Sequence, residues 1–333
     1  MNRFSFTTIT LLVFTLLSLI AGLTFGPANL SSTEIFQCIV GNCSSQVNQM
    51  VIWQVRVPRV LVALVAGMGL AIAGAILQNT TRNPLADPYL FGIVSGAGLG
   101  VTVVNLLLSS IDLNTELTIA LPFAAFLGAL FAITIVLIIA KILQRMEQLL
   151  LTGIAVSFML AAVTQFILFF GEPFATNRVI FWLMGSLARV EMSNFYVIAG
   201  ILLITIVTIT ALHRQIDALL LGDESAASLG INVDKLRLLM FALCAALTAT
   251  IVAYCGGIGF VGLMIPHIVR QMFGVTTLKL IFGSALIGGI FLIWVDIIAR
   301  SALANAEIPI GIITSALGSI FFLFIMVKTR NLN

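Results

Sequence analysis

Few side chains in this chain are placed where they could carry out acid–base, nucleophilic or metal chemistry. Its two histidines, His213 and His267, stand far apart, and no serine–histidine pair, carboxylate pair or cluster of metal ligands falls within a hydrophobic stretch. Asp296 and Arg300 lie four residues apart in one such stretch, so they can pair on one helix face. The phosphate-binding pattern Gly-x4-Gly-Lys-Ser/Thr does not occur. The residues therefore predict no enzyme, no bound metal or cofactor, and no nucleotide site of this kind.

Residues 213–237 form a long charged and small-residue segment between two hydrophobic stretches, and its pattern is suited to contacting another protein. Gly222 interrupts an apolar turn, Asp223 can cap a new helix, and Gly230 can end it. The helix would run from Glu224 to Leu229 and expose small side chains that fit a groove on a partner. These side chains are Ser225, Ala226, Ala227 and Ser228. The residues alone leave open the alternative of an ordinary amphipathic loop.

The amino-acid composition indicates the environment of the chain that contains this segment. Of the 333 residues, 60% are hydrophobic and 9% are charged, and the mean hydropathy is +1.18. Polar side chains are too few to cover a water-facing surface, which predicts an integral membrane protein. Only helices and closed barrels satisfy their backbone hydrogen bonds in lipid, and the continuous apolar runs here lack the alternation of barrel strands. We expect one all-α, polytopic domain over residues 1–333.

About ten transmembrane helices are expected, because a helix needs about 20 apolar residues to cross the bilayer. The runs that could form them are 6–25, 58–78, 91–109, 117–140, 148–170, 191–212, 236–255, 257–270, 278–298 and 310–327. With the N-terminus inside, most lysines and arginines fall on the inner side, and the exceptions are Arg56, Arg59, Arg178, Arg189 and Arg300. Both termini are therefore predicted to face the cytoplasm. The net charge of +3 follows from this bias and needs no nucleic-acid partner.

The loop before the hydrophobic run 58–78 contains residues that could cap a helix and residues that could form a disulfide. Ser31 and Glu34 predict a capped short helix on the outer surface. Cys38 and Cys43 could form a disulfide if that side is oxidising, or remain two free thiols. The residues alone leave both possibilities open.

Two connections between hydrophobic runs are candidates for a pathway or gate. Asn83 and Pro84 lie in a polar turn that a well-made reverse turn also explains. Residues 256–270 contain four glycines and Pro266. This segment is too short and too irregular to form a straight membrane span. Broken helices persist at membrane depth only where they are buried in protein or line a cavity. This pattern predicts a pathway or gate role for the residues Gly259, Gly262 and Pro266.

Several blocks of residues, in this order, resemble the permease subunit of type II ATP-binding-cassette (ABC) importers, the family that takes up iron–siderophore complexes, haem and cobalamin. The resemblance runs from about residue 50 to residue 327. Its main blocks are Arg56-Val-Pro-Arg59, Arg82-Asn-Pro-Leu-Ala-Asp-Pro88, Trp182-Leu-Met-Gly-Ser-Leu187, Leu221-Gly-Asp-Glu-Ser-Ala-Ala-Ser-Leu-Gly230, Gly259-Phe-Val-Gly-Leu263, Ala299-Arg300 and Glu307-Ile-Pro-Ile-Gly311. The chain departs from the usual family pattern at Tyr89-Leu-Phe-Gly92 and at Ser319-Ile320.

The resemblance implies the permease fold of these importers, with two permease subunits, two cytoplasmic ATPase subunits and a periplasmic or surface substrate-binding protein. It matches residues 215–230 to the coupling helices that contact the ATPase, and the coupling residues are Gly222, Asp223, Glu224, Ser225, Ala226, Ala227, Ser228, Leu229 and Gly230. Arg56, Arg59 and Arg300 match basic positions that dock on acidic residues of the binding protein, so we expect them to be exposed.

The expected function is transport of a metal chelate across the inner (cytoplasmic) membrane. An iron–siderophore complex is the preferred cargo, and cobalamin, haem or an oxyanion such as molybdate are alternatives. Thr152 and Ser157 are polar residues that we assign to the pathway wall. A secondary carrier driven by an ion gradient is the alternative of a different class. Such carriers usually need several buried carboxylates, and the hydrophobic runs here offer almost none.

Overall fold

The structure is a computed structural model that describes residues 3–26, 30–108, 117–143, 146–303 and 305–330. Helices, turns and loops make up these residues, and no strand occurs among them, which confirms the all-α prediction.

The α-helices follow one another with mostly short connections. They are α1 (Arg3–Thr24), α2 (Ser32–Ile39), α3 (Gln46–Met50), α4 (Val57–Thr81), α5 (Ile93–Leu108), α6 (Leu117–Leu143), α7 (Met146–Phe169), α8 (Pro173–Leu183), α9 (Met192–Leu219), α10 (Asp223–Ser228), α11 (Val233–Cys255), α12 (Val261–Phe273), α13 (Thr277–Ser301) and α14 (Ile310–Arg330). A π-helical turn, η1 (Val51–Arg56), leads into α4, and a 3-10 turn, η2 (Pro88–Phe91), precedes α5.

Each of the ten hydrophobic runs contains a helix. Eight helices among the described residues are long and apolar enough to cross a membrane by length and composition, namely α1, α4, α6, α7, α9, α11, α13 and α14. The other two runs form α5 and α12, which are shorter. The run predicted at 257–270 is corrected, because its helix begins at Val261 and ends at Phe273. The glycine-rich residues before Val261 form a non-helical linker instead.

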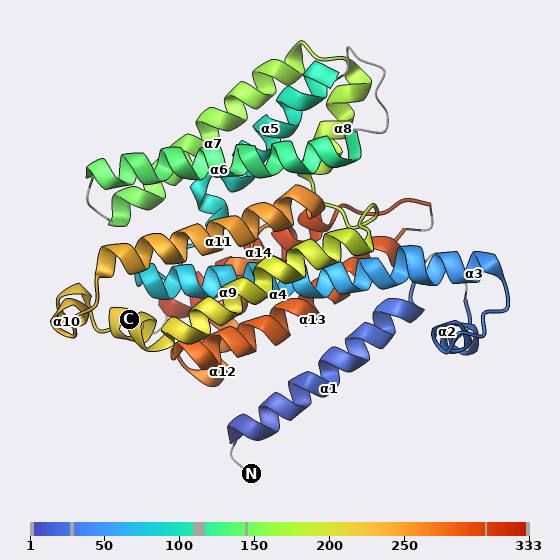
Figure 1. Ribbon diagram of the computed structural model, residues 1–333, viewed down its shortest axis with the longest axis horizontal. Helices are drawn as coiled ribbons and strands as arrows, with labels where there is room; N and C mark the ends of the chain where they lie inside the picture. The colour runs from blue at the N-terminus through green and yellow to red at the C-terminus, as the bar shows by residue number, and fades with distance from the viewer. Residues whose placement is uncertain (1–2, 27–29, 109–116, 144–145, 304, 331–333) are drawn as a thin grey trace.

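Helix α4 lies at the centre of the molecule (Figure 1). It packs against α13, α11, α12 and α9. Helix α11 also contacts α5 and α6, which belong to a second group formed by α5 to α8. Figure 1 shows α10 and the C-terminus at one end of the bundle, and α2 and α3 at the other. We call these the α10 end and the α2 end.

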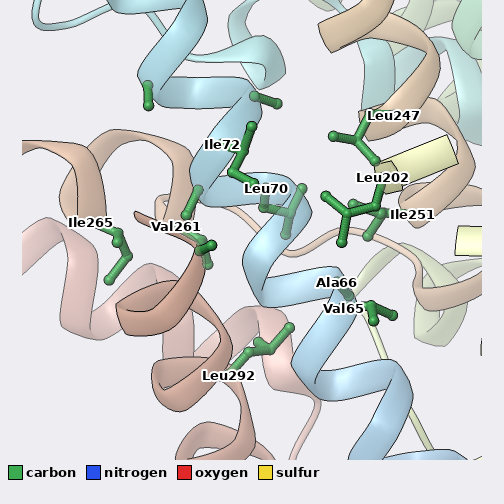
Figure 2. Close-up of a cluster of buried hydrophobic side chains, with 14 of the residues drawn as sticks. Val65, Ala66, Leu70, Ile72, Leu202, Leu247, Ile251, Val261, Ile265 and Leu292 are labelled. Carbon is green, nitrogen blue, oxygen red and sulfur yellow. The ribbon is translucent and has the colours of Figure 1, made fainter. Parts of the chain in front are cut away.

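The hydrophobic core surrounds α4, as Figure 2 shows. Leu70 and Ile72 of α4 are buried in one cluster with Leu247 of α11 and Leu292 of α13. Association of helices within lipid depends on close packing, and glycines permit the closest approach. At Gly67, a Cβ would overlap the carbonyl oxygen of Gly288 in α13. The small residue is therefore required by the contact between these two helices.

The loop at the α2 end is held by a helix cap and a disulfide. Ser31 and Glu34 form the expected capping box at the start of α2. Cys38 and Cys43 are joined by a disulfide, which decides between the two possibilities that the sequence left open.

Candidate functional site

Helix α10 confirms the predicted short helix at the α10 end, with its limits shifted to Asp223–Ser228. Gly230 follows in the left-handed conformation, with φ +80°. The predicted cap is wrong, because Gly222 takes the N-cap position and the Asp223 side chain does not cap the helix. Residues 215–219 belong to the last turns of α9, so the segment 215–230 contains one short helix rather than several.

One side of α10 is buried and the other faces outward. Ala226, which was predicted to lie on the surface, is fully buried in a core cluster that also contains Leu219 and Leu236. Among the predicted coupling residues 222–230, the exposed ones are Glu224, Ser225, Ala227, Ser228, Leu229 and Gly230. Leu221 and Leu229, just before and just after the helix, are 71% and 65% exposed. Small side chains flanked by two exposed leucines make a surface suited to a protein partner.

The Asp223 carboxylate joins α10 to two other helices. The guanidinium of Arg237 in α11 donates to both carboxylate oxygens, at 2.7 and 2.9 Å. Arg82, directly after α4, donates to the same carboxylate at 2.9 Å. These hydrogen bonds from Arg237, together with the two positive charges, hold the pKa of the Asp223 carboxyl below its usual range. Sequence reasoning did not predict that Asp223, Arg82 and Arg237 lie together. The only indication in the sequence was one acidic residue between two arginines that are distant in sequence.

The last turn of α4 is bound to several neighbouring elements. Arg237 also donates from Nε to the Thr80 carbonyl, at 3.3 Å. Gln78 accepts from Arg270 of α12 at 2.6 Å and donates to the Gly262 carbonyl at 3.1 Å. The carbonyl groups of a last helical turn lack partners within the helix, so side chains such as Arg237 satisfy them. The end of α4 is therefore tied to both α11 and α12.

A separate contact connects α9 with α13. Asp217, in the last turn of α9, accepts hydrogen bonds from the backbone N–H and the hydroxyl of Thr277, at 2.8 and 2.6 Å. The segment that carries α10 is thus attached to the bundle at its start through Asp217 and at its middle through Asp223.

The linker 256–260 lies between α11 and α12 and is fixed by specific contacts. The Ile258 N–H donates to the Tyr89 hydroxyl at 2.7 Å. Phe260 takes the left-handed conformation, with φ +67°, which is unusual for a bulky residue. Gly259 is half-buried, while Gly262 and Pro266 are buried in α12. The broken helix is confirmed, and its gating role stays a prediction.

The other candidate pathway residues occupy two kinds of position. The Asn83 side chain accepts from the Leu85 N–H at 2.9 Å in a tight turn, and Pro84 is exposed. Thr152 is buried in α7, and its assignment to the pathway wall stays a prediction. Ser157 is half-buried, and its hydroxyl donates to the Gly153 carbonyl of its own helix.

The arginines predicted to be exposed at the α2 end are buried. Arg59 is 5% exposed, donates to Asp296 from Nε, and donates to both Glu307 carboxylate oxygens, each bond being 2.8 Å long. Arg300 lies 3.3 Å from the other Asp296 oxygen, which confirms the predicted pair on one helix. A charge removed from water is costly unless it is paired, so these ion pairs explain the burial.

Arg56 is also buried, and it binds main-chain atoms. Its guanidinium donates to the carbonyls of Leu23 and Thr24 at 2.6 and 3.2 Å. The expected exposure of Arg56, Arg59 and Arg300 is therefore wrong in this structure. Their role in docking stays a prediction.

A cavity of about 600 Å³ lies at the α2 end, between α5, α8, α11 and the residues before α14. Its wall combines the guanidinium groups of Arg178 and Arg189 with the aromatic side chains of Phe174, Trp182 and Tyr254. The Arg178 guanidinium carbon lies 5.6 Å from the centre of the Phe174 ring. Sequence reasoning missed this cavity because it did not predict α8. Among the described residues, no group of three or more His, Cys, Asp or Glu side chains could hold a metal ion.

Comparisons with known proteins agree on the kind of molecule that this chain resembles. Residues 11–328 match the FecCD transport family. The Hemin transport system permease protein HmuU of Yersinia pestis is 35% identical over 317 residues, which is 95% of each chain. The Vitamin B12 import system permease protein BtuC of Vibrio cholerae is 35% identical over 288 residues, which is 86% of each chain. A solved structure described as an inward-facing, metal-chelate type ABC transporter covers 97% of this chain and 99% of its own, with 30% identity and a TM-score of 0.84.

Proposed function

This chain belongs to the FecCD transport family, and from that premise we propose that it moves an iron–siderophore complex across the inner (cytoplasmic) membrane. It is a multi-pass membrane protein and a permease of ABC importers, not an enzyme. ATP hydrolysis lies in a separate subunit. The complete importer would contain two permease subunits, two cytoplasmic ATPase subunits and a substrate-binding protein on the outer side.

The single observation that carries the ATP-driven importer in this proposal is the exposed face of α10. Its small residues Ala227 and Ser228, with the exposed Leu221 and Leu229 on either side, form a surface for a soluble partner. A carrier driven by an ion gradient has no need of such a surface. An ATPase subunit that closes on nucleotide would move α10 through this contact.

The cavity at the α2 end supports an anionic chelate as cargo. Arg178 and Arg189 supply two positive charges, and Phe174, Trp182 and Tyr254 supply flat apolar surfaces. Guanidinium groups bind carboxylates and other anionic oxygens in paired hydrogen bonds, and aromatic side chains pack on ring-shaped ligands. Carboxylate and catecholate siderophores loaded with iron offer both features. Haem, cobalamin and molybdate are the alternative cargoes.

Uptake by reconstituted liposomes tests this function. The liposomes would contain this chain with its ATPase and binding protein, and would be offered labelled ferric siderophores, haem, cobalamin and molybdate in separate samples. We expect uptake of one ferric siderophore that requires ATP and all three components. An ATPase subunit that cannot hydrolyse ATP is the matched control.

The other outcomes are equally informative. Uptake of cobalamin, haem or molybdate under the same conditions would retain the importer and overturn the choice of cargo. Uptake by this chain alone, driven by an ion gradient without ATPase, would overturn the importer itself.

A further inference from the structure

The Asp223 carboxylate stands at a junction of three elements at the α10 end. It is the first residue of α10, and it is bound by Arg82 after α4 and by Arg237 in α11. We propose that Asp223, Arg82 and Arg237 form the joint through which α10 moves the adjoining ends of α4 and α11. We call this group the Asp223 joint. The role of the Asp223 joint in transport rests on the proposed function. The geometry of the joint can be tested without assuming that function.

The geometry of the Asp223 joint favours a rigid connection over a loose surface ion pair. Arg237 binds both carboxylate oxygens with two parallel hydrogen bonds, which fixes direction as well as distance. Its side chain is 11% exposed, whereas that of Arg82 is 42% exposed. Salt therefore screens the bond to Arg82 more than the bonds to Arg237.

The local backbone structure also supports a rigid connection at the Asp223 joint. Asp223 is the first residue of α10, after the N-cap residue Gly222, and its side chain does not cap the helix. Arg82 takes the left-handed conformation, with φ +53°, which is uncommon for a residue other than glycine. The Asp223 carboxylate instead accepts hydrogen bonds from arginines of neighbouring elements. One of these, Arg82, donates from a strained backbone conformation.

The connection continues beyond the joint toward the linker 256–260. Arg237 also holds the Thr80 carbonyl, two residues before Arg82. In the same turn of α4, Gln78 binds Arg270 and the Gly262 carbonyl of α12. Helix α12 begins immediately after the linker. A displacement of α10 is thus passed by hydrogen bonds to α4 and from there to α12.

The first test measures the joint in the permease alone. Spin labels on Ser228→Cys in α10 and Leu85→Cys after α4 report the distance between these two exposed positions. We expect a narrow distance distribution that broadens in Asp223→Asn, which keeps the size of the side chain and removes its charge. Asp234→Asn is the matched control, because Asp234 is an exposed aspartate in the first turn of α11 that makes no ion pair with any described residue. An unchanged distribution in Asp223→Asn would overturn the joint.

The second test measures coupling in the assembled importer. Because Asp223 belongs to the segment expected to contact the ATPase, ATPase co-purification and ATP hydrolysis are both measured in Asp223→Asn beside cargo uptake. Cargo delivered per ATP should fall at least about tenfold. The double variant Asp223→Arg with Arg237→Asp restores opposite charges and should recover much of the lost ratio.

These readouts separate a joint from a merely structural residue. A structural residue would lower the melting temperature and ATPase co-purification together, and the charge exchange would not rescue transport. A cargo-to-ATP ratio in Asp223→Asn equal to that in Asp234→Asn would refute coupling through Asp223. If the unmodified importer shows no ATP-dependent uptake, the proposed function fails, while the distance measurement still decides whether the joint exists.

Discussion

Asp87 is a buried carboxyl group in the turn between α4 and α5. Its oxygen accepts a hydrogen bond from the Tyr89 N–H at 2.8 Å, at the start of η2. Burial raises the pKa of Asp87 to about 6, because the charged form loses its water. The folded protein therefore binds this proton more tightly than the unfolded chain does. Stability must fall as pH rises from about 3.8 through about 6, and the loss persists above that range.

Replacing Asp87 with asparagine should remove this pH dependence, since the amide oxygen can still accept from Tyr89. At pH 8 we expect Asp87→Asn to be more stable by up to about 3 kcal/mol, from a shift of about two pKa units. The difference should shrink toward pH 4. Thermal unfolding in detergent across this range measures it, with Asp234→Asn as the surface control. Equal gains at pH 4 and pH 8 would mean that the carboxyl charge is not the cause.

At the scale of helices, the contact between α4 and α13 depends on Gly67. A methyl group there would overlap the Gly288 carbonyl and lie 2.8 Å from the Leu292 Cβ, so the helices would have to separate. Gly67→Ala should lower the unfolding free energy by about 1–3 kcal/mol. Gly200→Ala in α9 is the matched control, because no atom lies within 4 Å of its new Cβ. That change should stabilise the helix by up to about 1 kcal/mol. Destabilisation by both variants would point to a general effect of the methyl group.

The two faces of α10 should respond differently to substitution. Ala227→Arg adds bulk and charge to the exposed face, and it should abolish ATPase co-purification and uptake without changing the melting temperature. Ala226→Arg places a charge in the core beside Leu219, so it should lower the melting temperature by itself. Normal ATPase binding in Ala227→Arg would exclude this face as the contact. Melting curves and co-purification from detergent distinguish these results.

At the scale of the whole molecule, the docking of a binding protein predicted at the α2 end would compete with ion pairs inside the permease. Glu307 occupies two guanidinium nitrogens of Arg59, and its own side chain is 37% exposed. An acidic residue of a binding protein would compete with Glu307 for Arg59. Glu307→Gln should therefore tighten binding-protein docking several-fold, most clearly at low salt. Equilibrium binding at two salt concentrations measures this, with Glu191→Gln as an exposed control. Weaker docking in Glu307→Gln would show that Glu307 itself contributes to the interface.

Sequence reasoning predicted those parts of the molecule that local rules determine. The hydrophobic runs other than 257–270, the capping box at Ser31 and the glycine after α10 depend on neighbours in the chain, and the structure contains them. The burial of Ala226 and of the arginines at the α2 end was missed, because it depends on packing between distant segments. The partners of Asp223 lie 14 and 141 residues away, and no local spacing indicates them. Helix α8 was missed because its 11 residues are too few and too polar to read as a span.

Main-chain hydrogen bonds join the segments beside the cavity at the α2 end, and Gly185, Ser186 and Cys255 of these segments line it. The Ser186 N–H donates to the Cys255 carbonyl at 2.9 Å, and the Ile310 and Gly311 N–H groups donate to the Gly185 and Met184 carbonyls, both at 3.0 Å. These bonds do not depend on the identity of the side chains above them. Arg178, Arg189 and the aromatic wall can therefore change during evolution while these main-chain contacts are kept. If this cavity receives the cargo, as proposed above, a change of a few wall residues would alter the cargo without requiring a new fold.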